Sequence, residues 1–293
     1  MDIRNIGVLS PGDMGQALAI RLGEAGFGVH GALDGRSDAT HRLAADAGVH
    51  DCGTVAELVG TADLIVSVVS PANATSVAND VAAAIRATGR RIAFADMNAI
   101  SPQLARDEAK VITDAGGLFI DGGIVGPPPR AEHARPKLYV SGPDAALFEQ
   151  IQHPNLQVRV LSDRAGDASA LKMCYAAMTK GVTAVTLELL VAAHEMGVSD
   201  AVERELRDSR ADVLDWQMAN FATVPARSGR WVPEMQQIAR TFQEVGLTPT
   251  IFQGAAELYA MVARTPLGKE TPEQARTAKR DGMTVTRTIA ETR

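Results

Sequence analysis

The chain has 293 residues and a net charge of -6 at pH 7, with 46% hydrophobic and 22% charged residues. This length predicts two domains of about 150 residues, each able to build a hydrophobic core. The acidic balance and the 4% aromatic content disfavour binding to nucleic acid or to an anionic membrane, because such surfaces need clustered positive charge and, for bases, stacking rings. The sequence has no uninterrupted apolar stretch of about 18 residues, so it predicts no membrane span.

The first expected element is a strand over 3–9 that runs into a small-residue turn and then into a helix. The turn consists of Ser10, Pro11, Gly12, Asp13, Met14 and Gly15. It has the form G-x-G-x-x-G with serine at the first glycine, which is the pattern of a dinucleotide-binding loop. Gly12 would let the backbone approach a pyrophosphate, whose charge would lie at the N-terminus of the helix. A turn that serves only packing is the alternative interpretation.

Short apolar runs alternate with helical segments up to about residue 162, which predicts a parallel sheet flanked by helices. The expected strands are 3–9, 29–33, 64–69, 91–95, 118–121, 138–141 and 158–161. Helical patterns then follow over 165–196, 202–220, 233–245, 250–263 and 272–289. We therefore predict an α/β fold: a Rossmann-type dinucleotide-binding domain over 1–163, and an all-α C-terminal domain over 164–293 that starts with a long central helix.

The residues after the second strand bear on the choice of cofactor. Asp34 predicts hydrogen bonds to a ribose 2′-hydroxyl, whereas Arg36 with the hydroxyl of Ser37 suits a 2′-phosphate. We favour NADP(H) over NAD(H), because Arg36 and Ser37 lie at the start of the next helix, where the helix dipole would also attract a phosphate. A solvated turn is the alternative.

Two further strands end in polar residues at the predicted carboxyl edge of the sheet, where ligands of open α/β folds bind. Val69, Ser70 and Asn73 follow one strand, and Asn98 and Ser101 follow the next. We expect Val69, Ser70, Asn73 and Asn98 to contact the cofactor, and Asn98 to contact the substrate as well. The polar residues can also serve as helix N-caps, which is the role expected for Ser101 before a proline.

Four motifs give the chain a resemblance to the β-hydroxyacid dehydrogenases, whose members include 3-hydroxyisobutyrate and 6-phosphogluconate dehydrogenases. SPGDMGQALAIRL resembles the nucleotide loop G-x-G-x-M-G, and DMNAISP resembles D-x-S-T-x-x-P. DGGIVGPPP is similar to the substrate loop D-A-P-V-S-G-G, and GDASALKMCYAAMTKG is similar to G-x-G-x-x-x-K-x-x-N-N. The C-terminal part resembles a branch with a phosphogluconate-dehydrogenase-like domain of unassigned substrate.

The resemblance places Lys172 on the catalytic lysine of the family. An ammonium can donate a proton to a carbonyl oxygen as hydride arrives, and in reverse the amine can accept the alcohol proton. We therefore expect Lys172 to be the general acid/base. A lysine on the protein surface is the alternative.

The resemblance also suggests substrate contacts from Val125, Gly126 and Tyr175, and Trp231 is a further candidate from the helical domain. The chain departs from the family at several of these positions. Val125 replaces a serine, and Tyr175 and Ala176 replace two asparagines. The late K-D-x-x-L segment corresponds to residues 243–247, QEVGL, which lack its lysine. With fewer polar anchors, the substrate stays a small molecule of unspecified identity.

The sequence thus predicts an NADP(H)-dependent oxidoreductase that moves hydride between nicotinamide and a hydroxyl or carbonyl carbon. An imine reductase is the alternative that Tyr175 favours and Lys172 disfavours, and a nucleotide-binding sensor without turnover is another. Cys52 and Cys174, expected to be buried, have no metal-ligand spacing, so we predict no metal and a reducing, cytoplasmic location. The apolar character of 165–196 suggests that a second subunit covers it in a homodimer.

Overall fold

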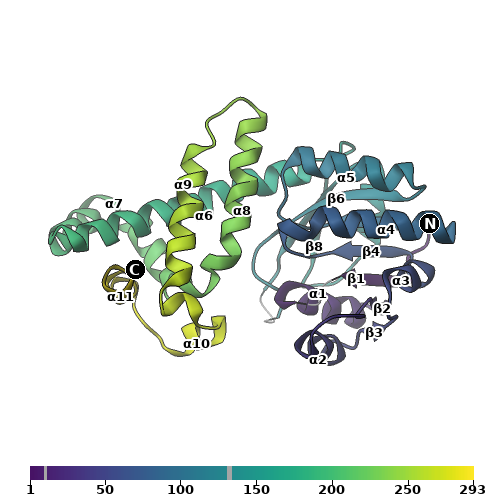
Figure 1. Cartoon of the computed structure of the whole chain (residues 1–293), viewed down its shortest axis with the longest axis horizontal. Helices are drawn as coiled ribbons and strands as arrows, with labels where there is room; N and C mark the ends of the chain where they lie inside the picture. The colour runs from purple at the N-terminus through teal and green to yellow at the C-terminus, as the bar shows by residue number, and fades with distance from the viewer. Residues whose placement is uncertain (10–11, 131–133) are drawn as a thin grey trace. The chain divides into compact units, whose positions relative to one another are not determined.

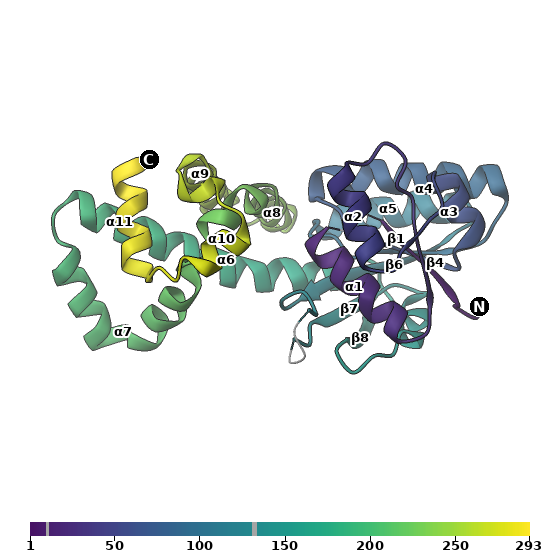
Figure 2. The same ribbon diagram turned by 90° about the horizontal axis from the view of Figure 1, so that it is seen from below.

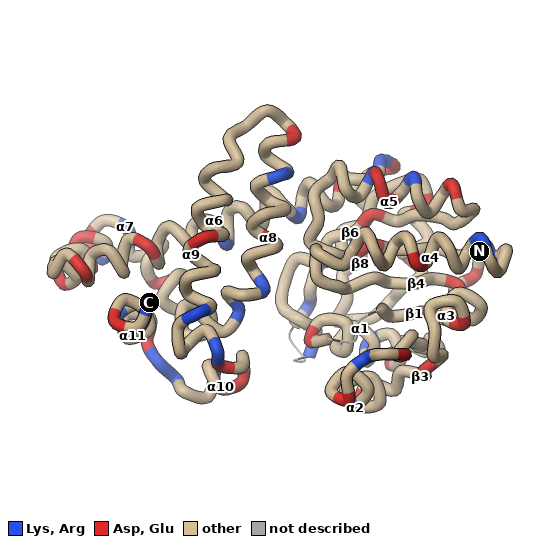
Figure 3. Tube along the Cα trace, viewed as in Figure 1, with Lys and Arg blue, Asp and Glu red and all other residues tan. Residues whose placement is uncertain are grey.

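The computed structural model describes residues 1–9, 12–130 and 134–293. Ser10 and Pro11, which are predicted to belong to the nucleotide loop, lie outside the described residues. The chain forms two compact units, Met1–Met173 and Cys174–Arg293. Basic and acidic residues are interspersed along the trace of each unit (Figure 3).

The first unit is built on one eight-stranded sheet with the order β3-β2-β1-β4-β5-β6-β7-β8. Strands β1 to β6 are parallel, β7 is antiparallel to β6, and β8 is parallel to β7. The order reverses between β1 and β4, which is the switch point of a doubly wound fold. The strands are β1 Asn5–Leu9, β2 Gly28–Gly31, β3 His50–Asp51, β4 Leu64–Ser67, β5 Ala93–Asp96, β6 Leu118–Val125, β7 Lys137–Ser141 and β8 Gln157–Ser162.

Helices cover both faces of this sheet. One face packs against α1 and α2, and the other against α3, α4 and α5 (Figures 1 and 2). Every residue of β4 and β5 is buried, as expected for parallel strands that are covered on both sides. The helical elements of this part are α1 Asp13–Glu24, α2 Asp38–Asp46, α3 Val55–Thr61, η1 Pro71–Asn73, α4 Ala74–Thr88, α5 Pro102–Asp114 and η2 Ala145–Gln150.

Two strands differ from the prediction. The strand β3, His50–Asp51, was not predicted, because it has only two residues, both exposed and polar, and pairs only with β2. The strand β6 continues past residue 121 to Val125 through two glycines that interrupt the apolar pattern. One of them, Gly123, allows a close approach: a Cβ there would lie 2.8 Å from the Lys172 Cβ and 3.1 Å from the Ala168 carbonyl oxygen.

The second part of the chain is helical, as predicted. Its longest helix, α6, begins within the first unit and continues into the second. Among the described residues, α6 alone is long and apolar enough to cross a membrane, yet 56% of its most apolar window is buried, which is typical of a core helix. The helical elements are α6 Asp167–Glu195, α7 Ser199–Phe221, α8 Pro225–Glu244, α9 Thr250–Arg264, η3 Leu267–Lys269, α10 Pro272–Thr277 and α11 Gly282–Thr292.

Two helix predictions in the second unit were wrong. The helix expected over 233–245 begins at Pro225, and Gly229 and Pro233 lie inside it, because its buried face packs along α9 (Figure 1). Packing therefore outweighs the low helix propensity of these two residues. The helix expected over 272–289 is two helices, α10 and α11. Lys279 has a φ of 47° between them, and the Asp281 carboxylate then accepts a hydrogen bond from the Thr284 N–H at 2.9 Å.

The cysteines also differ from the prediction. Both are free thiols, but Cys52 is half-buried and Cys174 is exposed. Cys174 lies on the exposed side of α6, next to the half-exposed Tyr175. Cys174 was expected to be buried as a small hydrophobic residue, but it lies on the exposed side of the helix.

Candidate functional site

The N-terminus of α1 begins at a glycine N-cap. Gly12 is its N-cap, and no side chain caps the helix among the described residues. The Gly12 φ of -73° is accessible to any residue, and a Cβ there would meet no described atom within 4 Å. Neither backbone conformation nor packing therefore requires glycine at this position. The open space at Gly12 would allow a ligand to approach the helix N–H groups closely. Met14 and Gly15 lie in the first turn of this helix.

The predicted ribose-binding residues lie beyond the end of β2. Ser37 is the N-cap of α2, and its hydroxyl accepts a hydrogen bond from the Thr40 N–H at 3.3 Å. Asp34 and Arg36 are exposed in the turn that precedes this helix. A phosphate at this position would meet the positive end of the α2 dipole beside a guanidinium.

Asn98 joins the ends of β4 and β5. Its side-chain carbonyl accepts a hydrogen bond from the Val69 N–H at 2.6 Å, and its amide donates to Asp96 at 2.7 Å and to the Ser67 hydroxyl at 3.1 Å. The Asn98 side chain is buried, and both of its N–H groups are used within the protein. Asn98 therefore fixes the loop at Val69, while Ser70 and Asn73 lie at the start of η1 and α4 on the same sheet edge.

The Glu108 carboxyl group is buried next to Asp96 at the end of β5. Glu108 of α5 is only 1% exposed, and among the described residues its carboxyl group has only the Asp96 carboxylate within hydrogen-bonding reach. Burial, and then the neighbouring Asp96 carboxylate, raise the pKa of Glu108 well above its usual range. Glu108 is therefore neutral at physiological pH.

Asp121 of β6 holds the first turn of α6. It is fully buried, and its carboxylate accepts hydrogen bonds from the N–H groups of Gly166, Ala168 and Ser169 at 2.9 to 3.1 Å. The hydroxyls of Ser141 and Ser169 also donate to it, at 2.7 and 2.6 Å. These bonds satisfy N–H groups that a helix N-terminus leaves without partners. The strand therefore fixes the start of the helix that carries Lys172.

Lys172 lies against the end of the same strand. Its ammonium donates a hydrogen bond to the carbonyl oxygen of Ile124, and its Cβ packs beside Gly123. Val125 and Gly126 follow directly, so the predicted proton donor lies beside these residues of the predicted substrate loop. Gly126 has a φ of 128°, a conformation that favours glycine.

The other two predicted substrate residues belong to the second unit. The Tyr175 side chain is 50% exposed on α6. Trp231 packs edge-to-face on Tyr259, with ring centroids 5.1 Å apart, and the Lys180 ammonium lies 5.4 Å from the Trp231 ring centroid while it pairs with Glu234. Trp231 lies inside α8, and these contacts give it a packing role.

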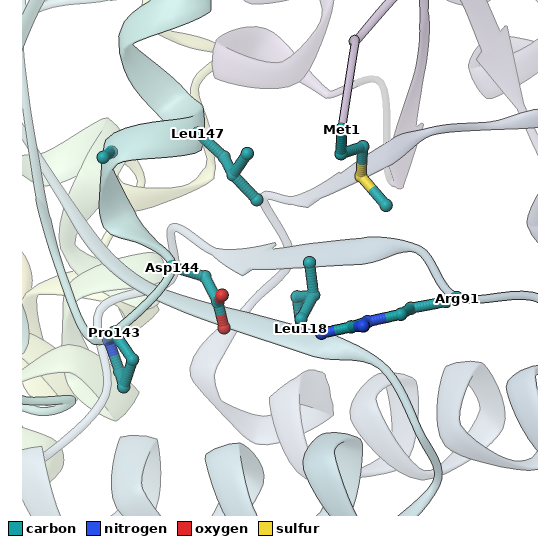
Figure 4. A pocket seen from close by; sticks show the side chains of 7 residues that line it. Met1, Arg91, Leu118, Pro143, Asp144 and Leu147 are labelled. Carbon is teal, nitrogen blue, oxygen red and sulfur yellow. The ribbon is translucent and has the colours of Figure 1, made fainter.

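A pocket of about 530 Å³ lies elsewhere, near the residues that precede or begin β5 and β6. It is lined by Met1, Arg91, Leu118, Pro143, Asp144, Ala146 and Leu147 (Figure 4). This is the amino edge of the parallel strands, whereas ligands of doubly wound folds bind at the carboxyl edge. The pocket contains none of the predicted site residues. Across the described residues, no group of three or more His, Cys, Asp or Glu side chains forms a metal site.

The doubly wound sheet and the open helix N-terminus after β1 define a dinucleotide-binding domain. Residues 5–155 match the family described as the NAD binding domain of 6-phosphogluconate dehydrogenase, and residues 193–262 match a domain of unknown function (DUF1932). The chain belongs to the β-hydroxyacid dehydrogenase family, and its first domain binds a pyridine nucleotide.

Known proteins support this assignment. The chain is 31% identical to L-threonate dehydrogenase of Cupriavidus necator over 209 residues, which are 70% of this chain and 66% of the relative. It has a TM-score of 0.71 and 20% identity to 3-hydroxyisobutyrate dehydrogenase of Mycobacterium tuberculosis, covering 95% and 100% of the two chains. An imine reductase from Myxococcus stipitatus in complex with NAD+ has a TM-score of 0.54 and 21% identity, covering 99% and 100%. The last two likenesses describe the fold.

Proposed function

We propose that this protein is an NADP(H)-dependent oxidoreductase that interconverts a hydroxyl and a carbonyl group on a small substrate, with Lys172 as the general acid/base. The observation that carries the proposal is the hydrogen bond from the Lys172 ammonium to the carbonyl oxygen of Ile124, a residue of the predicted substrate loop. A proton donor held beside that loop can act on the oxygen of a substrate bound there.

The chain supplies the binding groups and the proton, and a bound nicotinamide supplies or accepts the hydride. The open N-terminus of α1 holds the diphosphate, and Asn98 fixes the loop at Val69 that completes the cofactor side. Asp121 fixes the first turn of α6 and thus the direction of the Lys172 side chain. Val125 and Gly126 are the proposed substrate contacts of this domain.

The test is NADPH oxidation by the purified full chain against a panel of aldehydes, keto acids and preformed imines. We expect turnover with a carbonyl compound. Reduction of imines alone would support the imine reductase alternative, which the shared fold and the exposed Tyr175 favour. Tight NADPH binding without any turnover would contradict the proposal and support a sensor.

The proposed preference for NADP(H) depends on Arg36 and on the N-terminus of α2. Replacing Arg36 with alanine is expected to weaken NADPH binding about tenfold or more, while NADH binding changes little, because a charged hydrogen bond to the 2′-phosphate is lost. Fluorescence titration with both cofactors measures this. Arg42→Ala, an exposed arginine on the same helix, is the control. Equal losses for both cofactors would contradict the assignment.

We also propose a cytoplasmic homodimer. Met178, Val182, Val185 and Leu189 recur on one side of α6, and Met178 and Val185 are 59% and 57% exposed. This spacing is that of a helix seam that packs on another helix. Val185→Asp is expected to weaken dimerisation at least about tenfold, since it buries a charge. Light scattering measures the mass, with Val213→Asp on α7 as the control. A wild-type monomer would contradict the proposal.

A further inference from the structure

An arginine of the β6–β7 loop is paired with an acidic residue in the first turn of α1. The Arg130 Nε donates to the Asp13 carboxylate at 3.0 Å. Its Nη2 donates to the Asp13 carbonyl oxygen at 3.1 Å and to the Gln16 side-chain oxygen at 2.8 Å. These contacts join residues 114 to 117 positions apart in the chain, so the loop that follows the substrate loop reaches the helix of the nucleotide loop.

The backbone of this loop is held separately from the Arg130 side chain. Arg21, two turns further along α1, donates from Nε to the Pro129 carbonyl oxygen at 2.8 Å and from Nη2 to the Arg130 carbonyl oxygen at 3.0 Å. The Arg21 side chain is only 16% exposed. Removal of the Arg130 guanidinium would therefore leave the loop attached to α1.

Asp13 creates an electrostatic conflict at this helix. It is the first residue of α1, and its carboxylate stands in the turn whose N–H groups are proposed to hold a diphosphate. A carboxylate beside a diphosphate repels it, and its negative charge offsets the positive end of the helix dipole. The pairing with Arg130 cancels that charge. The Asp13 and Arg130 side chains are 57% and 44% exposed, so both charges would act on an anion bound at this helix end.

We propose that Arg130 is an affinity determinant for the cofactor: it neutralises Asp13 and so makes the N-terminus of α1 attractive to the dinucleotide diphosphate. This inference rests on the proposed function. The proposal also links the nucleotide loop to the substrate loop, because Arg130 lies four residues after Gly126 of the substrate loop. The pairing serves electrostatics, whereas Arg21 provides the mechanical attachment.

The test is a double-mutant cycle on the dissociation constant of NADPH, measured by fluorescence titration of the full chain at low salt. We expect Arg130→Gln to weaken binding about three- to tenfold, because Asp13 is left unpaired. Asp13→Asn should bind as well as the wild type or better. The double variant should return to within about twofold of the wild type, since neither charge remains. The loss in Arg130→Gln should shrink at high salt.

Arg135→Gln, an exposed arginine of the same loop, is the matched control and should not change binding. Thermal melting verifies that each variant is folded. If Arg130→Gln binds like the wild type, or if Asp13→Asn is equally damaging and the double variant is not rescued, the inference is wrong. If the wild type binds no pyridine nucleotide, the proposed function itself fails and the inference fails with it.

Discussion

Replacing Lys172 with alanine is expected to lower kcat by about 10²- to 10⁴-fold, the usual contribution of a positioned general acid or base. The dissociation constant of NADPH should change little. Lys172 of α6 contacts the end of β6, whereas the proposed diphosphate site lies at the N-terminus of α1. Steady-state kinetics on the carbonyl substrate found in the panel, together with cofactor titration, measure both quantities.

The conservative variant separates proton transfer from charge. Lys172→Arg keeps a cation near Ile124, but a guanidinium stays protonated and cannot accept the alcohol proton. We expect it to be nearly as inactive as the alanine variant in the oxidation direction. Lys110→Ala, an exposed lysine on α5, is the control. Full activity of Lys172→Ala would rule out the assignment of this lysine as the acid/base.

Local sequence patterns predicted the parts of the fold that depend on local chemistry. The apolar runs predicted β1, β4 and β5, because strands buried on both faces must be continuously hydrophobic. Packing between helices decided the rest. Gly229 and Pro233 suggest a helix break when they are considered alone, yet contacts with α9 keep α8 continuous through both residues.

The candidate site likewise combines features that local sequence predicts with features that depend on packing. A motif placed Lys172 on a helix, but its position beside Ile124 depends on Gly123, which lets that helix approach β6. The sequence does not distinguish Gly12 from Gly123. The structure does: a Cβ at Gly12 meets no described atom within 4 Å, whereas at Gly123 it meets the backbone of α6. Gly12 leaves open space at the start of α1, and Gly123 leaves room for a helix.

Long-range partners explain what sequence reasoning missed. Asp121 entered the sequence analysis only as part of a motif. Its role as the acceptor for the N–H groups of the α6 N-terminus was not predicted, although such groups need an acceptor. Asn98 was expected to contact ligands, but its side-chain amide makes hydrogen bonds within the protein, to Val69, Asp96 and Ser67. Arg130 and Asp13 are separated by 117 positions, and no local pattern predicts that pair.

Asp121 and Glu108 are two buried carboxyl groups for which we expect opposite responses to the same change. In Asp121→Asn, the amide oxygen can replace the Oδ2 that accepts from the N–H groups of α6, but the negative charge that strengthens these bonds is lost and the amide nitrogen must face the Ser169 hydroxyl. We expect a loss of about 3 kcal/mol or more in the free energy of unfolding, and faster hydrogen exchange at Ala168 and Ser169. Denaturant titration and exchange mass spectrometry measure these effects.

Glu108→Gln is the matched control, because a neutral amide replaces a carboxyl group that is itself neutral. The raised pKa of Glu108 means that wild-type stability is fully present below the unfolded pKa near 4.5 and is lost as pH rises toward the raised folded value. Glu108→Gln removes this dependence, so it should match or exceed the wild type at pH 8. A large loss in Glu108→Gln, or none in Asp121→Asn, would contradict this difference between the two sites, because a buried carboxylate is tolerated only where hydrogen-bond donors surround it.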